Sequence, residues 1–479
     1  METVKEHTEK EAGENKEIFR DSVSTIDERG KRVWLYPKQP KGKLYNARTI
    51  ASFFYLAVFF TLPFIKINGH PLFLFNVIER KFIFFGVVFW PQDFHLFLVG
   101  MLTFIVFIIV FTVAYGRLFC GWACPQTVFM EMVFRRIEYL VEGDAKQQRM
   151  LNSQRANNKK LAKKIIKHSI FFLISFIIAN AFLSYIIGAD QLFHIMKEPV
   201  KAHLGGFISL LAFTGVFYGV FAWFREQACL IVCPYGRMQG VLLDKNSIVV
   251  AYDYKRGEPR GHLKKEPAKK HGDCVDCSLC VHVCPTGIDI RNGTQLECVN
   301  CTACIDACDA VMDKVKKPRG LIRYASENDI AEGRRLRIST RKIAYGIVLV
   351  LLTGFLAFLL VTREDVETTV LRAPGLLFNR ETDGRISNVY KVKVINKTYK
   401  GIPIRFVLEN KQGEIKMIGN DMLVKPEGLA EGQFFIYLPV SQIDKRKTEV
   451  EIGVYAGDEK IETITTTFMG PVTPKKQTK

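Results

Sequence analysis

The sequence predicts a multi-domain membrane protein with a five-span α-helical membrane domain, a cysteine-rich α+β insert and a C-terminal β-sandwich. Long apolar blocks alternate with basic polar stretches, although the overall hydrophobic content of the 479 residues is an ordinary 48%. All twelve cysteines fall in short clusters, and the tail without cysteine carries short β-branched and aromatic runs. A chain of this length is expected to form several folding units.

Five apolar blocks are long enough to cross the hydrocarbon layer, which takes about 20 residues in a helix. They lie at about residues 49–67, 94–116, 168–189, 204–224 and 343–361. A sixth apolar region, residues 71–90, is interrupted by Glu79-Arg80-Lys81 in its middle. Each half is too short for a span, so this region is expected to be interfacial or re-entrant.

Basic residues flank the spans unequally, and this asymmetry predicts the orientation. The loop after the second span and the segment before the fifth are rich in Lys and Arg, whereas the loop between the third and fourth spans has Lys197 and Lys201. By the positive-inside rule the N-terminus and both long basic loops are cytoplasmic. Five spans then place the C-terminus on the opposite side. The polar N-terminus has no apolar core, so no cleavable signal peptide is expected.

The formal net charge of +19 would suggest nucleic-acid binding in a soluble protein. Here the surplus Lys and Arg lie beside membrane spans, so orientation in the membrane accounts for the charge. No nucleic-acid partner is therefore expected. Tight cysteine clusters on a basic loop likewise favour metal ligation in a reducing compartment over a disulfide framework.

The tail from about residue 362 is predicted to be an all-β sandwich. Short strand-like runs occur at about residues 389–395, 404–408, 433–438 and 449–455, with turn-rich linkers between them. The tail has no cysteine, so it has neither a disulfide nor a thiolate metal site. Its methionines, Met417, Met422 and Met469, are sparse, and a core or surface role is expected for them rather than copper binding.

The insert carries two cysteine runs that are typical of four-iron four-sulfur clusters. The first is Cys274-x-x-Cys277-x-x-Cys280-x-x-x-Cys284-Pro285, and the second is Cys298-x-x-Cys301-x-x-Cys304-x-x-x-Cys308. In such pairs the first three cysteines of one run and the fourth of the other hold one cluster, because three thiolates in a tight loop face only three corners of a cube. The run spacing does not fit structural zinc, which favours two separated cysteine pairs.

This pattern predicts two ligand sets in a bacterial-type double-cluster ferredoxin domain. The first insert set is Cys274, Cys277, Cys280 and Cys308, and the second insert set is Cys298, Cys301, Cys304 and Cys284. Cys308 is followed by Asp309 instead of the usual proline. That proline shapes the turn and does not ligate, so its replacement leaves the prediction standing.

The remaining cysteines form two similar pairs at the membrane surface. Cys120-Gly-Trp-Ala-Cys124-Pro125 follows the second span and Cys229-Leu-Ile-Val-Cys233-Pro234 follows the fourth, and an arginine, Arg117 or Arg225, precedes each pair. We call Cys120, Cys124, Cys229 and Cys233 the membrane-surface set. If the two hairpins pack side by side, these thiols could hold copper as Cu(I), a further cluster, or nothing, since free cysteine is often a small buried residue.

The expected domain boundaries follow from these features. Residues 1–47 form a cytoplasmic N-terminal segment, residues 48–250 a membrane domain with four spans, residues 251–342 the ferredoxin domain, residues 343–361 the fifth span, and residues 362–479 the β domain.

Several motifs in order resemble the CcoG/FixG/RdxA accessory proteins of the cbb-type haem–copper cytochrome oxidase. The resemblance covers nearly the whole chain from about residue 19. Its motifs are Gly30-Lys-Arg-Val-Trp-Leu-Tyr-Pro, the two cysteine pairs with their flanking residues, Tyr252-Asp-Tyr-Lys-Arg-Gly-Glu-Pro-Arg-Gly, the ferredoxin runs, Cys308-Asp309 and Gly320-Leu-Ile-Arg-Tyr. The resemblance implies an immunoglobulin-like C-terminal domain in the periplasm and a location in the bacterial inner membrane.

The resemblance also implies a role in assembling the oxidase, by reduction of Cu(II) to Cu(I) for insertion into its active site. Expected partners are oxidase subunits or copper-delivery proteins, with an unknown electron donor. The membrane-surface set would then be the copper or redox site, fed by the two clusters. Two other functions stay open: a quinol-linked membrane ferredoxin subunit that serves another redox partner, and a non-catalytic copper chaperone or scaffold.

Overall fold

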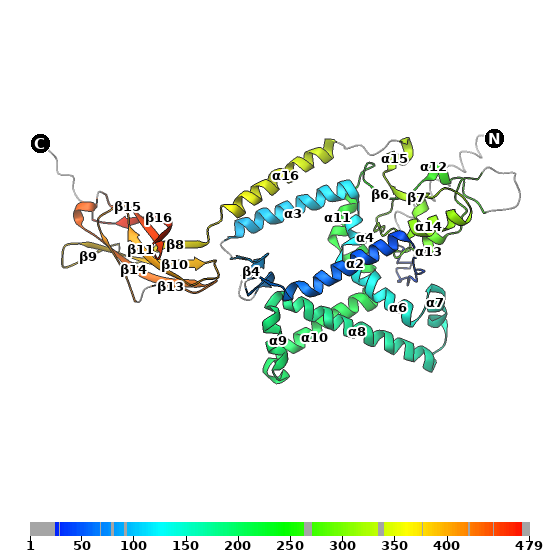
Figure 1. The fold of residues 1–479 in the computed structure, drawn as a ribbon, viewed down its shortest axis with the longest axis horizontal. Helices are drawn as coiled ribbons and strands as arrows, with labels where there is room; N and C mark the ends of the chain where they lie inside the picture. The colour runs from blue at the N-terminus through cyan, green and yellow to red at the C-terminus, as the bar shows by residue number, and fades with distance from the viewer. Residues whose placement is uncertain are drawn as a thin grey trace. The chain divides into compact units, whose positions relative to one another are not determined.

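The computed structural model describes residues 24–471 except 28, 68, 78–80, 91–92, 263–270, 334–339, 376, 420–421 and 444. The chain forms two compact units, Met1–Leu74 with Leu98–Leu356 and Phe75–Phe97 with Ala357–Lys479. The first unit contains the cysteine-rich insert and most of the apolar helices, and the second contains the β-sandwich (Figure 1). The first half of the predicted N-terminal segment, including the expected absence of a signal peptide, lies outside the described residues.

Five helices among the described residues are long and apolar enough to cross a membrane. Their segments are Lys43–Phe64, Phe94–Tyr115, Asn158–Ile187, Val200–Phe224 and Thr340–Val361. They are built on α2 (Lys43–Thr61), α3 (Phe94–Tyr115), α8 (Asn158–Ile187), α10 (Leu204–Gly219) and α16 (Thr340–Val361), which run from blue to yellow in Figure 1. The predicted five-span fold class is confirmed. No residue of α16 is buried, as expected for a helix that faces lipid.

Two spans begin earlier than their apolar blocks. The first helix starts at Lys43 and the third at Asn158, so each extends into polar sequence. Lys and Arg favour helix nearly as well as leucine does, and such residues continue a helix beyond the hydrocarbon layer. In the interior of the bundle, α8 packs against α10 and the π-helical turn Val220–Phe224 through a core that includes Phe134, Phe171 and Phe221.

The apolar region at residues 71–90 forms no span, as predicted, but it is an antiparallel sheet. Strands β3 (Phe73–Asn76), β4 (Lys81–Phe84) and β5 (Val87–Phe89) lie in that order. The hairpin between β4 and β5 turns at Phe85 and Gly86, which have φ of 52° and 77°. Two positive φ values at a two-residue turn match the twist of antiparallel strands. The small strand pair β1 (Lys66–Ile67) and β2 (His70–Pro71) precedes this sheet.

The insert is held together by one two-stranded sheet and short helices. Strands β6 (Val249–Tyr252) and β7 (Ile322–Ala325) pair antiparallel although about 70 residues separate them. Between them lie α12 (Tyr254–Gly257), α13 (Leu279–His282), η7 (Ile290–Asn292) and α14 (Ala303–Lys314), and α15 (Glu327–Glu332) follows. Ile288, Met312 and Leu321 are among the buried residues of its core, which surrounds the cysteines.

The tail forms the predicted sandwich of two antiparallel sheets. One sheet has the order β12-β14-β10-β8, with β9 beside β10, and the other has the order β13-β11-β15-β16. The strands are β8 (Val366–Arg372), β9 (Asn379–Arg380), β10 (Ile386–Asn396), β11 (Ile402–Leu408), β12 (Glu414–Met417), β13 (Met422–Val424), β14 (Leu429–Leu438), β15 (Lys447–Ala456) and β16 (Glu459–Met469). Alternate residues point inward, and Tyr390 stacks on Phe434 in the core.

Within this second unit, ion pairs fasten the sandwich to the segment that precedes α3. The Asp93 carboxylate accepts hydrogen bonds from Lys397 Nζ at 2.7 Å and from Arg363 Nη2 at 2.9 Å. Burial would raise the pKa of Asp93, but the hydrogen bonds from Arg363 and Lys397 hold it below its ordinary value.

Candidate metal centres

The two cysteine runs of the insert adopt the same local turn. In each run the second cysteine lies between two residues with left-handed backbone. These residues are Asp276 and Ser278 around Cys277, and Asn300 and Thr302 around Cys301, with φ between 47° and 66°. Such residues are strained, and turns of this kind aim successive backbone N–H groups at one point, where they bind anions and iron–sulfur groups. The repeated turn therefore fits the cluster that the spacing predicts.

The first insert set lines one pocket. Cys274, Cys277 and Cys280 come from the loop and the start of α13, and Cys308 comes from α14. Apolar side chains such as Leu321 and Ile322 form the rest of the wall, together with Arg291. All four thiols are free, so the donor chemistry suits a four-iron cluster. Ligation by this set stays a prediction.

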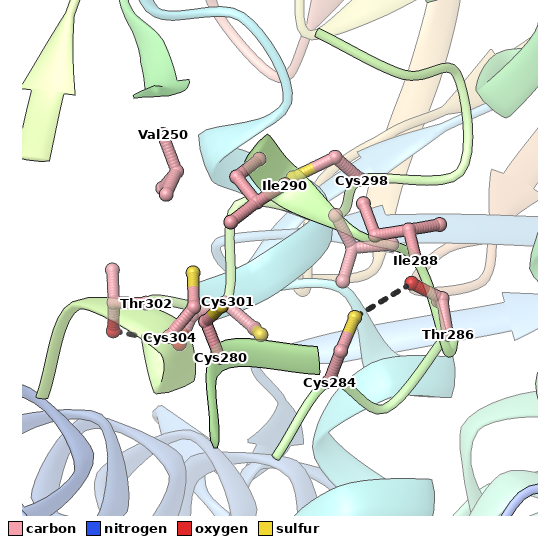
Figure 2. A pocket seen from close by; sticks show the side chains of 11 residues that line it. Val250, Cys280, Cys284, Thr286, Ile288, Ile290, Cys298, Cys301, Thr302 and Cys304 are labelled. Carbon is pink, nitrogen blue, oxygen red and sulfur yellow. Dashed lines mark hydrogen bonds between the residues drawn. The ribbon is translucent and has the colours of Figure 1, made fainter. Parts of the chain in front are cut away.

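The second insert set lines a neighbouring pocket, shown in Figure 2. Cys298, Cys301 and Cys304 come from the second run, and Cys284 reaches the pocket from the end of the first. Cys284 Sγ lies 3.3 Å from Thr286 Oγ1. Cys280 lines both pockets, so the two sets share a wall.

Burial controls the protonation of these thiols. It raises the pKa of Cys280 and Cys298 to about 12 and that of Cys301 to about 11. Without a metal the thiols therefore keep their protons near neutral pH. Metal binding displaces these protons, because the thiolate is the ligand form.

The two membrane-surface pairs also have a common local structure. The second cysteine of each pair, Cys124 or Cys233, has extended backbone and precedes a helix that begins with proline, α5 (Pro125–Val128) or α11 (Pro234–Leu242). A residue before proline is held extended, and proline is favoured at the first helical position because its missing N–H is not needed there. The sequence repeat thus becomes a structural repeat.

The first cysteine of each pair lies in the preceding turn, and this is where the repeats differ. Cys120 lies in the short helix α4 (Leu118–Trp122), whereas Cys229 lies in the π-helical turn η6 (Ala228–Val232). The Cys120 thiol donates to Gln239 Oε1 at 3.1 Å.

The four thiols of the membrane-surface set lie close enough to interact electrostatically. The pKa of Cys229 is raised to about 12, mainly by burial and in smaller part by Cys124, Cys120 and Cys233. Among the residues that the structure describes, no three Cys, His, Asp or Glu side chains converge as they would around a single ion. The thiols of the two insert sets do not converge on one point either; they surround a pocket. In this respect the membrane-surface set resembles the insert sets.

The loop between Cys298 and Cys301 lies in close contact with the glycine between Cys120 and Cys124. A Cβ atom on Gly121, between Cys120 and Cys124, would lie 2.5 Å from the Val299 carbonyl oxygen and 2.8 Å from that of Asn300. Only glycine allows this approach, since both neighbours are backbone atoms. The Gly121 carbonyl in turn accepts a hydrogen bond of 2.7 Å from Arg48 Nε. The loop between Cys298 and Cys301 therefore lies against the Cys120 pair.

Further contacts fix the insert to the first unit's helices. The Asp306 carboxylate, on α14, accepts from the backbone N–H groups of Leu44 and Tyr45 at 3.2 and 2.7 Å, and so caps the start of α2. Any side chain at Gly42 would collide with Asp306. The N-terminal segment also binds the insert, since Lys38 N donates to the His282 carbonyl at 2.8 Å. The insert is thus held against the helices of the first unit by direct hydrogen bonds.

The arginines that precede the two cysteine pairs have different surroundings. Arg225 makes a two-pronged ion pair with Glu138 at 3.0 and 2.9 Å, and both side chains are buried. Arg117 instead donates from Nε to Gln239 Oε1 at 2.9 Å and from Nη1 to the Leu296 carbonyl. Another buried arginine, Arg135, pairs with Glu131 at 3.2 Å.

Sequence reasoning missed several residues of this region. Gly121 lies inside a motif that the sequence singled out, and glycine is the residue that allows the backbone of another segment to approach closely. Arg48, immediately before the first apolar block, also gave a signal. The sequence carries no signal for Gln239 or Asp306, because their hydrogen-bond partners lie far away in the chain.

Three family models match the chain. A model described as a 4Fe-4S dicluster domain matches residues 224–327, and one described as a 4Fe-4S binding domain matches residues 97–141. The first range contains the Cys229 pair and both insert runs, and the second contains the Cys120 pair. A third model, described as the IG-like fold at the C-terminal of FixG, matches residues 356–471.

Curated relatives match most of the chain. It is 37% identical over 386 residues to protein RdxB of Cereibacter sphaeroides, which covers 77% of this chain and 80% of the relative. It is 34% identical to nitrogen fixation protein FixG of Rhizobium meliloti, over 76% of this chain and 77% of the relative. Protein RdxA of C. sphaeroides is 33% identical, over 80% of this chain and 83% of the relative.

Proposed function

Because this chain belongs to the FixG/RdxA family of membrane iron–sulfur proteins, we propose that it reduces Cu(II) to Cu(I) during biogenesis of a cbb-type cytochrome c oxidase. The observation that carries the proposal is the contact at Gly121, which joins the second insert set to a thiol-rich site. Cupric reduction needs a one-electron pathway that ends at soft ligands, and thiolates favour Cu(I). Both requirements are met within one unit of the chain.

The residues have distinct parts in this proposal. Cys274, Cys277, Cys280 and Cys308 hold one four-iron cluster, and Cys284, Cys298, Cys301 and Cys304 hold the other. When bound, such clusters supply one-electron transfer over a wide range of potentials. The membrane-surface set binds the copper substrate or relays the electron to it. Apolar walls exclude water from the two cluster sites, with Ile288 and Ile290 at one and Leu321 and Ile322 at the other.

The redox step balances with one electron and no proton. A low-potential reductant protein of the cytoplasm loses one electron, and Cu(II) gains it to become Cu(I). In this proposal the N-terminus and the insert are cytoplasmic, and the β-sandwich is periplasmic, in agreement with the basic loops of the sequence. Cu(I) then passes to oxidase subunits or to copper-delivery proteins.

Anaerobic purification with metal analysis and a single-turnover copper assay tests the proposal. The protein is reduced with dithionite, desalted and mixed with Cu(II) and a chromogenic Cu(I) chelator. Wild type is expected to form Cu(I), and serine variants of Cys120 and Cys229 are expected to form much less while keeping about eight irons per chain. Met417→Leu, which removes a soft thioether from the sandwich, is the matched control and keeps wild-type activity.

The same preparation distinguishes the other functions. Copper binding without reduction would identify a chaperone or scaffold. Quinol oxidation without copper reduction would identify a quinol-linked electron-transfer subunit. If serine replacement of all four membrane-surface cysteines left copper binding and reduction intact, that site assignment would be wrong. About twelve irons per chain would show that these cysteines hold a third cluster.

A further inference from the structure

We propose that Arg117 is a positioning residue that serves as the common counter-charge of the second insert set and the membrane-surface set, and raises the reduction potential of the centres they hold. The proposal rests on the proposed function only in treating both sets as redox sites. Its test uses protein without copper, so it stands or fails separately from cupric reduction.

Three elements hold the Arg117 side chain. Arg117 precedes α4, and its Nε donates to Gln239 Oε1 of α11 at 2.9 Å. Its Nη1 donates to the carbonyl of Leu296, two residues before Cys298. Its Nη2 lies close to Gly236, where a Cβ atom would be 2.9 Å away. The guanidinium is therefore clamped between both membrane-surface pairs and the insert.

The charge of Arg117 has no carboxylate partner in the part of the chain that the structure describes. Its side chain is only 3% exposed, and the acceptors it binds are an amide and a backbone carbonyl. Buried charges are normally paired, because an uncompensated ion is costly to desolvate. Arg225, its counterpart in the second repeat, is paired with Glu138 in that way. Arg117 thus needs a counter-charge from another source.

Thiolates of the two sets are the nearest source of that charge. The Cys120 thiol donates to the same Gln239 Oε1 that accepts from Arg117 Nε, and Arg117 Nη1 binds the carbonyl of Leu296, two residues before Cys298. A Cβ atom on Gly236 would lie 2.8 Å from the Cys229 carbonyl oxygen and 2.9 Å from Arg117 Nη2. Cys120 and Cys229 belong to different membrane-surface pairs, and Cys298 belongs to the second insert set. Four thiolates around an iron–sulfur core leave a net negative charge, so a metal-loaded centre supplies what Arg117 lacks.

The effect on reduction potential has a definite sign. Reduction adds negative charge to a centre, and a fixed positive charge beside it stabilises the reduced form. Removing that charge must therefore lower the potential. The effect is selective, because the Arg117 guanidinium contacts Gln239 and Leu296, whereas Arg291 lines the pocket of the first insert set.

The experiment is a redox titration of the full-length protein in detergent, followed by electron paramagnetic resonance. For Arg117→Gln, one of two titration waves is expected to move to lower potential. At the wild-type midpoint its reduced-to-oxidised ratio should fall at least tenfold, which corresponds to 59 mV for one electron. The other wave is the internal reference. Arg117→Lys keeps the charge without the planar fork and should restore most of the shift.

Two further variants separate charge from folding. Gln239→Glu leaves Arg117 in place and gives it a carboxylate, so the same wave should move in the same direction. Arg237→Gln removes an exposed charge from the same helix as Gln239 and should move neither wave. Unchanged potentials in Arg117→Gln with full iron content would overturn the proposal, as would a lysine variant as defective as the glutamine variant. If Arg117→Gln loses iron, an unshifted wave in Gln239→Glu overturns it.

Discussion

Replacing Gly121 by alanine tests whether the insert is held against the first membrane-surface pair. The added Cβ would lie 2.5 and 2.8 Å from two backbone oxygens, those of Val299 and Asn300. Backbone cannot rotate away as a flexible side chain can, so the loop itself must move. Overpacking of a close-packed site costs about 1–3 kcal/mol. If this cost falls on docking, the ratio of docked to undocked insert decreases by roughly 5- to 150-fold.

Amide hydrogen exchange measures this docking directly. The peptide that contains Val299 and Asn300 should exchange faster in Gly121→Ala, while the core strands of the sandwich keep wild-type protection. Gly100→Ala is the matched control, because that helical glycine has open space around it. Copper reduction should decline in parallel in Gly121→Ala and not in the control. Wild-type protection of the peptide in Gly121→Ala would refute the close contact.

Three other predictions concern acidic side chains that stabilise each unit from within. Asp306→Ala removes the cap of α2 and should cost about 1 kcal/mol, seen as a lower Tm. Glu138→Gln leaves the buried Arg225 without its counter-charge and should cost about 3 kcal/mol in denaturant unfolding. Asp93 has a folded-state pKa below its ordinary value near 3.8. Its ion pairs with Arg363 and Lys397 therefore stabilise the fold fully above that value, and Tm should fall as the pH is lowered below it through the folded-state pKa.

Each of these has an outcome that contradicts it. An Asp306→Ala variant as stable as wild type would show that water replaces the cap without loss. Equal stability of Glu138→Gln and wild type would mean that Arg225 is not buried as described. For Asp93, an Asp93→Asn variant should melt at a temperature that depends less on pH between 5 and 3, and an unchanged pH profile would exclude this ion pair as its cause.

The membrane fold could be predicted from the sequence because its physical signal is local. A span needs a continuous apolar block, and each of the five blocks became a helix. The helix ends were less accurate, since Lys43 and Asn158 lie in polar sequence that no apolar block marks. The sheet at residues 73–89 was missed because short apolar runs suit several structures, and the hairpin at Phe85 and Gly86 has no common turn signature.

At the thiol sites, the sequence does not predict which charged side chains pair with one another. Cysteine spacing predicts which thiols form a ligand set, because ligands of one turn must be close in sequence, and this assignment stays a prediction. The same reasoning treated Arg117 and Arg225 as equivalents, since each precedes a cysteine pair. Their difference depends on Glu138, which faces Arg225 and has no counterpart beside Arg117 among the described residues. Only the folded chain shows which of two similar arginines is paired.

The cap that Asp306 places on α2 also concerns the order of synthesis. The capped residues precede Asp306 by about 260 positions. At 5–20 residues per second, a ribosome makes the cap roughly 13–50 s after it makes the start of the first span. During that interval the backbone N–H groups at the start of the first helix lack the Asp306 acceptor. The first span is thus made well before the residue that caps it, and the cap joins the helix only once the insert has folded against it.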